Sequence, residues 1–342
     1  MQPLREILES LLQRRDLSES DAEALLTHLT NPDAPPALCG ALLAALRSKG
    51  VTAAEVRGFA RGMRRLAERP QIAVGLRAID IVGTGGDASG SLNISTGTAL
   101  LAAACGLPVV KHGNRSVSSR AGSADVLEAL GLALPLDAQA AGKCLAATNF
   151  TFLFAPHYHP AMKAIAPVRS ALGVRTIFNI LGPLANPAAP PLHLIGAFSL
   201  DAARLIADAL AGFDIERGFV IHGAEGWDEP TPMGPFTLHD VHRGRVTVEV
   251  RTPEEYGLGR CTAAALAGGG AAHNARALRA VMYGEDRGAH RDCLLMGAAL
   301  ALEVAGEERQ PREGVARAAA AIDDGSARRV LDRVSSFTVR TS

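Results

Sequence analysis

Two stretches of the sequence carry residue types and spacing that suit an anion. An apolar run at 78–82 is broken by Gly83-Thr-Gly-Gly-Asp87, and hydroxyl side chains at 95–96 lead into an alanine-rich helical stretch. Glycines let backbone N–H groups approach an anion, and a helix N-terminus adds partial positive charge. A second apolar run ends in Lys111, and Arg115 follows, so both supply formal charge beside the loop. These features predict a site for a phosphorylated small molecule.

The glycine loop differs from two widespread phosphate-binding motifs. Gly83-x-Gly85-x-x-Ala88 fits the dinucleotide fingerprint, but that motif opens its helix at once and has an acid after the second strand. Here about a dozen residues separate Val82 from the helix, and the second strand ends in Lys111. No Lys-Ser or Lys-Thr closes the glycine run, so the sequence lacks a Walker loop. An ordinary tight turn is the competing interpretation of the loop alone.

Three further groups of polar residues could take part in chemistry. Asp228 and Glu229 follow an apolar strand. Two neighbouring carboxylates can bind Mg²⁺ when phosphate oxygens supply its remaining ligands. The alternative is that the two acids lie on a solvated turn. Arg169 could be a solvated helix residue, but it carries the planar guanidinium that suits a carboxylate. His157 and His159 could bind a metal, but no cysteine or acid lies nearby at ligand spacing. Polar contacts or capping are therefore the favoured interpretation of the two histidines.

The composition of the 342 residues excludes several classes of protein. Lys plus Arg and Asp plus Glu both number 35, so no overall charge attracts nucleic acid or a membrane surface. The five cysteines are scattered and never in C-x-x-C spacing, which indicates reduced thiols. The sequence shows neither a signal pattern nor an apolar run of membrane length. We expect a cytoplasmic protein that binds neither nucleic acid nor membranes.

Residues 1–70 are predicted to form helices only. Leucines and isoleucines recur there at helical spacing, and Ser18-x-x-Asp21 and Thr52-x-x-Glu55 have the form of N-terminal caps. The helices carry a spare apolar stripe, which could pack within the chain or against a second subunit. We expect a helical domain over 1–70, to which part of 165–190 could belong.

From residue 78 onward, apolar runs and helical patterns alternate, which predicts an α/β domain over 75–342 with a mostly parallel central sheet flanked by helices. The predicted strands are Ile79–Val82, Pro108–Lys111, Thr151–Phe154, Leu192–Phe198, Gly218–His222 and Phe236–Val241. Alternating valines at 246–250 predict a late antiparallel hairpin. The predicted helices include Ala138–Ala147, Asp201–Ala211, 271–283, 289–305, 312–324 and 327–334.

Longer motifs connect these separate features. They are Asp80-Ile-Val-Gly-Thr-Gly-Gly-Asp87, Asn93-Ile-Ser-Thr96, Lys111-His-Gly-Asn-Arg-Ser-Val-Ser-Ser119, 122–131, Phe154-Ala-Pro156, His159-Pro-Ala-Met-Lys163, Pro167-Val-Arg169, Arg175-Thr-Ile-Phe-Asn-Ile-Leu-Gly-Pro-Leu184 and Asp228-Glu229. Through these motifs essentially the whole chain resembles the anthranilate phosphoribosyltransferase family. The resemblance implies transfer of the phosphoribosyl group from 5-phosphoribosyl 1-pyrophosphate (PRPP) to anthranilate, the second step of tryptophan biosynthesis from chorismate.

The resemblance also implies a role for each matching residue. The donor PRPP would be held by Gly83, Gly85, Gly86, Asp87, Asn93, Ser95, Thr96, Lys111 and Ser119. Magnesium, as two ions together with the pyrophosphate, would be held by Ser95, Asp228 and Glu229. Anthranilate would contact Gly83, His112, Asn114, His159, Arg169, Gly182 and Pro183. No covalent catalyst is implied; Lys111, Asn114 and Arg169 would position the reactants. A homodimer built through the N-terminal helices is implied as well.

The chemistry of the residues agrees with this reaction. Displacing pyrophosphate from an anomeric carbon requires charge neutralisation at the leaving group more than a covalent nucleophile. The ribosyl centre gains oxocarbenium character, so alignment of donor and amine supplies much of the remaining rate. The sequence departs from the family pattern at Ala88 and Leu92, where glycine and phenylalanine are expected, but neither change removes a charged group.

Two other functions belong to related proteins. A pyrimidine nucleoside phosphorylase carries an additional C-terminal domain, for which this chain has no room, and does not require the paired magnesium acids. A non-catalytic nucleic-acid-binding relative should show a basic stripe and a degraded donor loop; the balanced charge and intact loop oppose it.

Overall fold

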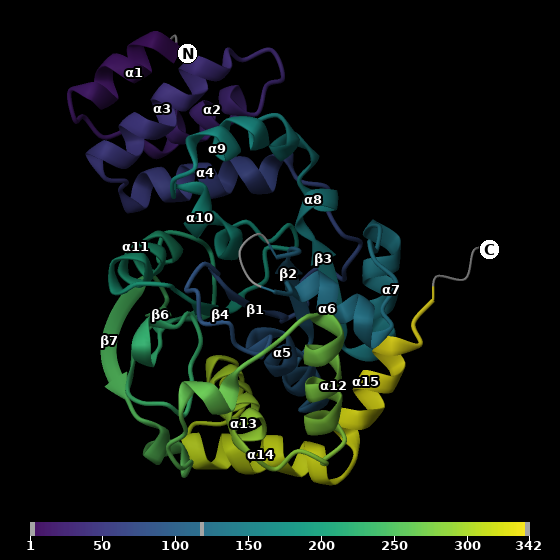
Figure 1. Cartoon of the computed structure of the whole chain (residues 1–342). Coiled ribbons are helices and arrows are strands. Elements are labelled where there is room, and N and C mark those ends of the chain that lie inside the picture. The colour runs from purple at the N-terminus through teal and green to yellow at the C-terminus, as the bar shows by residue number, and fades with distance from the viewer. Residues whose placement is uncertain (1–3, 117–119, 339–342) are drawn as a thin grey trace.

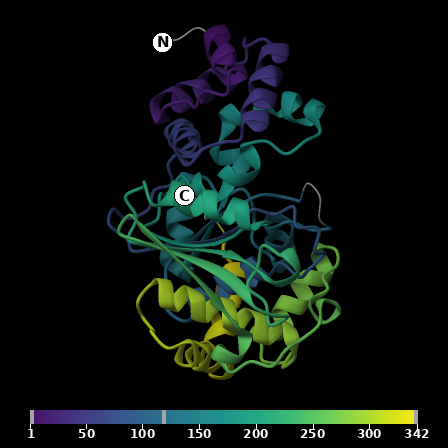
Figure 2. The ribbon, with the colours of Figure 1, turned by 90° about the vertical axis from the view of Figure 1, so that its left-hand side faces the viewer.

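The computed structural model describes residues 4–116 and 120–338. A bundle of N-terminal helices stands above a central β-sheet (Figure 1), and a view from the side shows further helices below the sheet (Figure 2). The α-helices are α1 (Leu4–Leu12), α2 (Glu19–Leu29), α3 (Pro36–Lys49), α4 (Ala53–Leu66), α5 (Ile94–Ala104), α6 (Ser123–Leu130), α7 (Ala138–Thr148), α8 (Ala155–Tyr158), α9 (Ala166–Leu172), α10 (Phe178–Leu181), α11 (Leu200–Leu210), α12 (Ala271–Met282), α13 (Ala289–Val304), α14 (Pro311–Asp323) and α15 (Ser326–Ser335). The 3-10 helices are η1 (Pro160–Lys163), η2 (Gly182–Leu184), η3 (Ala224–Gly226), η4 (Pro253–Tyr256) and η5 (Ala263–Leu266).

The sheet has seven strands in the order β3-β2-β1-β4-β5-β6-β7. They are β1 (Ile79–Gly83), β2 (Val109–Gly113), β3 (Phe150–Phe154), β4 (Leu192–Gly196), β5 (Arg217–His222), β6 (Phe236–His242) and β7 (Arg245–Arg251). Strands β1 to β5 pair in parallel, whereas β6 and β7 are antiparallel to their neighbours. The predicted mostly parallel sheet and the late hairpin are confirmed. Because parallel strands share one carboxyl edge, the loops after β1, β2, β4 and β5 lie along the same side.

The two faces of the sheet contribute to different hydrophobic clusters. Ile81 and Leu194 pack in the cluster formed with helices α5 to α7 and α12 to α15. Ile195 and Val220, which point to the opposite face, pack with α11 and with the N-terminal helices. This division follows from the alternation of side chains along a strand. Both faces are therefore covered, as a parallel sheet requires.

The ends of the elements mostly agree with the sequence prediction. Strand β4 is the clearest difference, because it stops at Gly196 rather than at the predicted Phe198. The chain turns there since Ser199 caps α11, accepting a hydrogen bond from the N–H of Ala202 at 3.2 Å. The two predicted N-terminal caps are present, and Thr52 forms a complete capping box with Glu55.

Nothing in the described ranges resembles a membrane span: each helix of residues 4–116 and 120–338 is too short or too polar to cross a bilayer.

Candidate active site

The glycine-rich loop follows β1 and contacts Asp228. Gly85 and Gly86 have φ angles of 69° and 77°, in the left-handed region that glycine adopts without strain. The N–H of Gly85 donates to the Asp228 carboxylate, and the Thr84 hydroxyl lies 3.5 Å from the same oxygen. A Cβ on Gly83 would lie 2.5 Å from Asp228 Oδ2. The close approach of this carboxylate therefore requires glycine at the end of β1.

The loop continues through a turn that contains Ala88. Its φ angle of 59° is uncommon for a residue with a Cβ, and costs on the order of 1 kcal/mol. The conformation explains why glycine is expected at this position. The turn is held by Ser89, whose N–H and hydroxyl donate to Asp87 at 3.2 and 3.0 Å. Beyond the turn, the N–H of Leu92 donates to the carbonyl of Leu266 at 3.0 Å.

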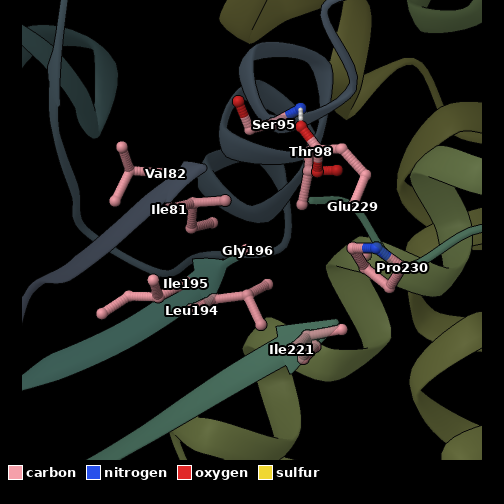
Figure 3. Close-up of a pocket in the computed structure, with 11 residues that line it drawn as sticks. Ile81, Val82, Ser95, Thr98, Leu194, Ile195, Gly196, Ile221, Glu229 and Pro230 are labelled. Atoms are coloured by element: carbon pink, nitrogen blue, oxygen red, sulfur yellow. Dashed lines mark hydrogen bonds between the residues drawn. The ribbon is translucent and has the colours of Figure 1, made fainter. Parts of the chain in front are cut away.

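Ser95, Glu229 and Lys111 come from three segments and meet at the N-terminus of α5. The N–H of Ser95 donates to Glu229 Oε1 at 3.1 Å, and Lys111 Nζ donates to Ser95 Oγ at 3.1 Å. Figure 3 shows the Glu229 carboxylate turned toward Ser95. Lys111 is almost fully buried and also donates to the carbonyl of Ile81. The positive end of the helix dipole thus lies beside one acid and one lysine.

The positive charge around the acids of this site is too small to keep their pKa values at the ordinary level. Burial, followed by the charge of Asp87, raises the pKa of Asp228 to about 7. Burial and then the charge of Asp228 raise the pKa of Glu229 well above its ordinary value. Burial also lowers the pKa of Lys111, although Asp80 and the two other acids oppose this shift. A cation beside Asp228 and Glu229 would favour their charged forms, so the donor set fits a magnesium ion.

Ser95 and Glu229 line a small cavity at the carboxyl ends of β1, β4 and β5 (Figure 3). Ile81, Thr98 and Gly196 are among the residues that line it. Its volume of about 10 Å³ is enough for roughly one water molecule. The cavity is therefore too small for a sugar phosphate.

Two buried histidines lie beside the loop after β2. The ring centroids of His112 and His159 are 5.0 Å apart, and Nδ1 of His112 is 3.2 Å from the carbonyl oxygen of Gly182. Burial lowers the pKa of His112 to about 3 and that of His159 to about 4. Both rings are therefore neutral at pH 7. Within the described ranges, Nε2 of each ring is buried and has no hydrogen-bond partner, the kind of polar group that is costly to leave unpaired.

The zinc alternative for His157 and His159 gains no support. Among the described residues, no group of three or more histidines, cysteines and acids could hold a metal ion. The His157 ring instead packs edge-on against Tyr158, with ring centroids 5.3 Å apart.

Arg169 lies on α9 and has no acidic partner among the residues described. Its guanidinium carbon is 4.8 Å from the centre of the Phe178 ring, and burial lowers its pKa. Each ion pair found in the described ranges involves other residues. The planar fork of Arg169 is therefore available to a carboxylate.

The remaining predicted site residues differ in how the structure holds them. Asn93 Nδ2 donates to the carbonyl of Ala121 at 3.1 Å, and Asn274 donates to Asn93 Oδ1 at 2.8 Å. Thr96 is buried at the start of α5, and Asn114 accepts from the N–H of its neighbour. Pro183 is buried within η2, next to the Gly182 carbonyl that His112 contacts. Ser119, predicted to bind PRPP, lies outside the described residues.

Arg115, which was expected to supply formal charge beside the loop, is paired with acids in the structure. Its guanidinium binds Asp125 at 2.8 Å and Glu128 at 2.6 Å, so two acids of α6 neutralise it. Lys111, the other expected positive charge, instead contacts Ser95 at the N-terminus of α5.

Sequence reasoning missed a buried pair beneath the site, Asp80 and Asn186. Asp80 accepts hydrogen bonds from the N–H of His112 at 3.2 Å and from Asn186 Nδ2 at 2.8 Å. Asn186 also donates to the carbonyl of Val110 at 2.8 Å. The pair ties β1 and β2 to the segment after Gly182. The only available signal was an acid within an otherwise apolar strand pattern.

His193 gives a pH dependence of stability. It is fully buried in β4, and burial lowers its pKa to about 3, whereas an unfolded histidine titrates near 6.5. Folding stability is therefore lost as the pH falls below about 6.5, because only the unfolded chain binds the proton. Between pH 7.5 and 5.0, the free energy of unfolding should fall by roughly 2 kcal/mol more in wild type than in His193→Leu. Urea unfolding at both pH values measures this, and equal losses would contradict it.

Comparison with known proteins assigns the family. The model of the glycosyl transferase family helical bundle domain matches residues 5–67, and that of the a/b domain matches residues 75–328. Anthranilate phosphoribosyltransferase of Rubrobacter xylanophilus is 44% identical over 330 residues, which cover 96% of each chain. The enzyme of Thermus thermophilus superposes with a TM-score of 0.90 at 40% identity, covering 97% of this chain and 98% of that one. The Saccharomyces cerevisiae enzyme, solved in complex with PRPP and Mg, superposes with a TM-score of 0.88 at 28% identity, covering 98% of each chain. The sequence resemblance is confirmed, and the chain belongs to the anthranilate phosphoribosyltransferase family.

Proposed function

We propose that this protein transfers the phosphoribosyl group from PRPP to anthranilate, giving N-(5-phosphoribosyl)anthranilate and pyrophosphate in the second step of tryptophan biosynthesis from chorismate. The observation that carries the proposal is the meeting of the glycine loop with Asp228, Glu229 and Lys111 at the N-terminus of α5. A relative of the same family is solved with PRPP and Mg. The site therefore combines donors for phosphate oxygens with acids for the accompanying metal.

The test is product analysis after mixing the protein with magnesium, PRPP and anthranilate. Mass spectrometry should detect phosphoribosyl-anthranilate, and its formation should require all three small molecules. Parallel samples with thymidine and phosphate test a nucleoside phosphorylase activity, and single-stranded DNA tests the nucleic-acid-binding alternative. Absence of the product, or activity only on the nucleoside, would overturn the proposal.

For the donor we propose contacts with Gly83, Gly85, Gly86, Asp87, Asn93, Ser95, Thr96, Lys111 and Ser119. The left-handed backbone at Gly85 and Gly86 supports this assignment, because it allows loop N–H groups to approach an anion closely. Lys111 adds a buried positive charge next to Ser95. The N-terminus of α5 contributes further partial charge.

For the metal we propose Ser95, Asp228 and Glu229 as ligands, with two magnesium ions bound together with the pyrophosphate. The raised pKa values of both acids support this assignment, because a neighbouring cation would stabilise their charged forms. The proposal assigns only two acids to the metal, so phosphate oxygens and waters would complete the ligands. Mg²⁺ bound there would supply positive charge to the departing pyrophosphate.

For the acceptor we propose Gly83, His112, Asn114, His159, Arg169, Gly182 and Pro183. The bond from the anomeric carbon to pyrophosphate breaks, a bond to the anthranilate nitrogen forms, and the amine loses a proton. The lowered pKa values of His112 and His159 support this assignment, because the neutral rings would add polar groups without adding charge. Lys111, Asn114 and Arg169 act by positioning, since the reaction requires no covalent intermediate.

We further propose a domain division into 1–70, joined by part of 165–190, and 75–342. Side chains of α9, such as Val168 and Leu172, pack in the same cluster as Leu42 of α3, which supports the addition of α9 to the helical domain. A cytoplasmic location is consistent with five cysteines that are all free thiols.

We also propose a homodimer through the N-terminal helices. Leu12 at the end of α1 is 62% exposed, and an apolar groove of about 550 Å³ runs between α3 and α9. We expect sedimentation of a dimer at micromolar concentration, shifted toward monomer by Leu12→Glu. Val248→Glu on β7, where the valine is 60% exposed, is the matched control and should leave the dimer intact. A wild-type monomer would remove the proposal.

A further inference from the structure

Arg175 joins the helical part of the chain to the glycine loop. It lies between α9 and α10, and its Nη2 donates to the carbonyl oxygen of Gly86. Its guanidinium carbon is 4.1 Å from the centre of the Phe198 ring. Phe198 follows β4, and its N–H donates to the Thr84 hydroxyl at 3.1 Å. The arginine therefore contacts both the loop and the residue against which the loop packs.

The backbone of Arg175 is held from the other side. Arg47, at the end of α3, donates to the carbonyl oxygen of Arg175. A continuous series of contacts thus runs from α3 through Arg47 and Arg175 to Gly86. None of these groups is a ligand proposed above except Gly86, so the series lies outside the binding machinery itself.

The contact with Gly86 fixes a sensitive part of the loop. Gly86 has a left-handed φ of 77°, and its freedom of rotation makes the loop costly to order. The peptide bond between Gly86 and Asp87 is planar, so a donor that holds the carbonyl also fixes the direction of the following N–H. A hydrogen bond to the Gly86 carbonyl therefore orders a backbone donor in the loop proposed to receive the phosphates.

We propose that Arg175 is a positioning residue that orders the glycine loop for PRPP and couples that order to the helical part of the chain. This inference rests on the proposed function, because it assigns the loop to the donor. Arg175 is exposed at the loop surface and makes no ion pair with an acid in the ranges described. Its side-chain contacts there are with Gly86 and Phe198, so the arrangement serves the loop rather than the core.

Arg175→Lys tests the proposal, because lysine keeps the charge but cannot stack its head group flat on Phe198 while donating to Gly86. We expect the Michaelis constant for PRPP to rise roughly five- to tenfold, since a hydrogen bond to a charged group is lost. The constant for anthranilate should change less than about twofold and the melting temperature should not change. Hydrogen exchange of the peptide covering 84–92 should be faster in the variant without PRPP.

Arg61→Lys is the matched control. Arg61 also lies in the helical part and donates to the carbonyl of a glycine, Gly212, at 3.3 Å. Its guanidinium carbon is 5.6 Å from the centre of the Phe213 ring. Its contact is at the opposite end of α11 from Phe198, so this variant should leave both Michaelis constants unchanged. A PRPP constant unchanged in Arg175→Lys, or raised equally in both variants, would overturn the inference. Wild type is assayed alongside the variants. If wild type forms phosphoribosyl-anthranilate, an unchanged PRPP constant in Arg175→Lys contradicts only the role of Arg175; if wild type forms no product, the proposed reaction itself has failed.

Discussion

Turnover should be abolished, falling by roughly a thousandfold or more, when Asp228→Asn is combined with Glu229→Gln. Asp228 contacts the glycine loop, and Glu229 accepts a hydrogen bond from Ser95 at the N-terminus of α5. The two carboxylates are the acids proposed to bind a magnesium–pyrophosphate complex at this edge of the sheet. Amides keep the size of each side chain but remove the negative charge that the metal requires.

The same double variant should fold normally. Burial and neighbouring acids raise the pKa values of both carboxyls, so a neutral amide relieves the burial of charge rather than breaking a stabilising ion pair. We therefore expect an unchanged or slightly higher melting temperature without metal. In wild type, magnesium with PRPP should raise that temperature, and in the variant this increase should disappear.

A control variant separates the metal site from a general effect of removing two charges. Glu307 and Glu308 are also adjacent, and both pair with Arg317 on the surface. Glu307→Gln with Glu308→Gln should retain wild-type turnover. If the Asp228 and Glu229 variant keeps near-wild-type activity at saturating magnesium, the metal assignment is wrong.

The sequence was sufficient to predict most of the fold because its periodic patterns are local. Runs such as Ile79–Val82 alternate with helical stretches, and the caps at Ser18 and Thr52 mark helix starts. The parallel strands β1 to β5 consist mostly of buried residues, which favours the continuous apolar runs that the sequence contains. The main error in strand length, at β4, arose because Phe198 is apolar while the chain already turns toward the Ser199 cap.

The candidate site was predicted less completely, because contacts between distant segments have no local signal. The pairing of Arg115 with Asp125 and Glu128 depends on how α6 packs beside the loop after β2. Likewise, the pairing of Asp80 with Asn186 brings together residues that are 106 positions apart. Neither contact leaves a periodic pattern. By contrast, the glycine loop and the adjacent acids could be singled out from residue type and from their place after apolar runs, although a tight turn and a solvated turn remained alternatives for each motif alone.

Replacing Arg169 with alanine should raise the Michaelis constant for anthranilate by on the order of ten- to a hundredfold, with little change in the constant for PRPP. The amine of anthranilate is a weak base and is already neutral at pH 7, so the enzyme need not remove a proton before attack. It must instead orient the amine toward the anomeric carbon. The ortho carboxylate is the group by which it can do so.

The surroundings of Arg169 favour this role. The guanidinium packs on Phe178 and has no acidic partner in the described ranges, and burial lowers its pKa. A guanidinium in such a position gains more from a carboxylate than one already paired at the surface. Two charge-assisted hydrogen bonds, each worth roughly 1.5–3 kcal/mol when desolvated, account for the expected loss of affinity.

Aniline, which lacks the carboxylate, separates recognition of this group from a general defect. Wild type should use anthranilate far better than aniline, and Arg169→Ala should lose most of that preference because it weakens only the anthranilate reaction. Arg328 provides the control, since its guanidinium lies 4.7 Å from the Tyr283 ring centre on a different pair of helices. Arg328→Ala should keep both constants and the preference. Two outcomes for Arg169→Ala would show that Arg169 supports only the helical structure around Phe178. One is an equal rise in the Michaelis constants for PRPP and anthranilate; the other is a lower melting temperature without a change in either constant.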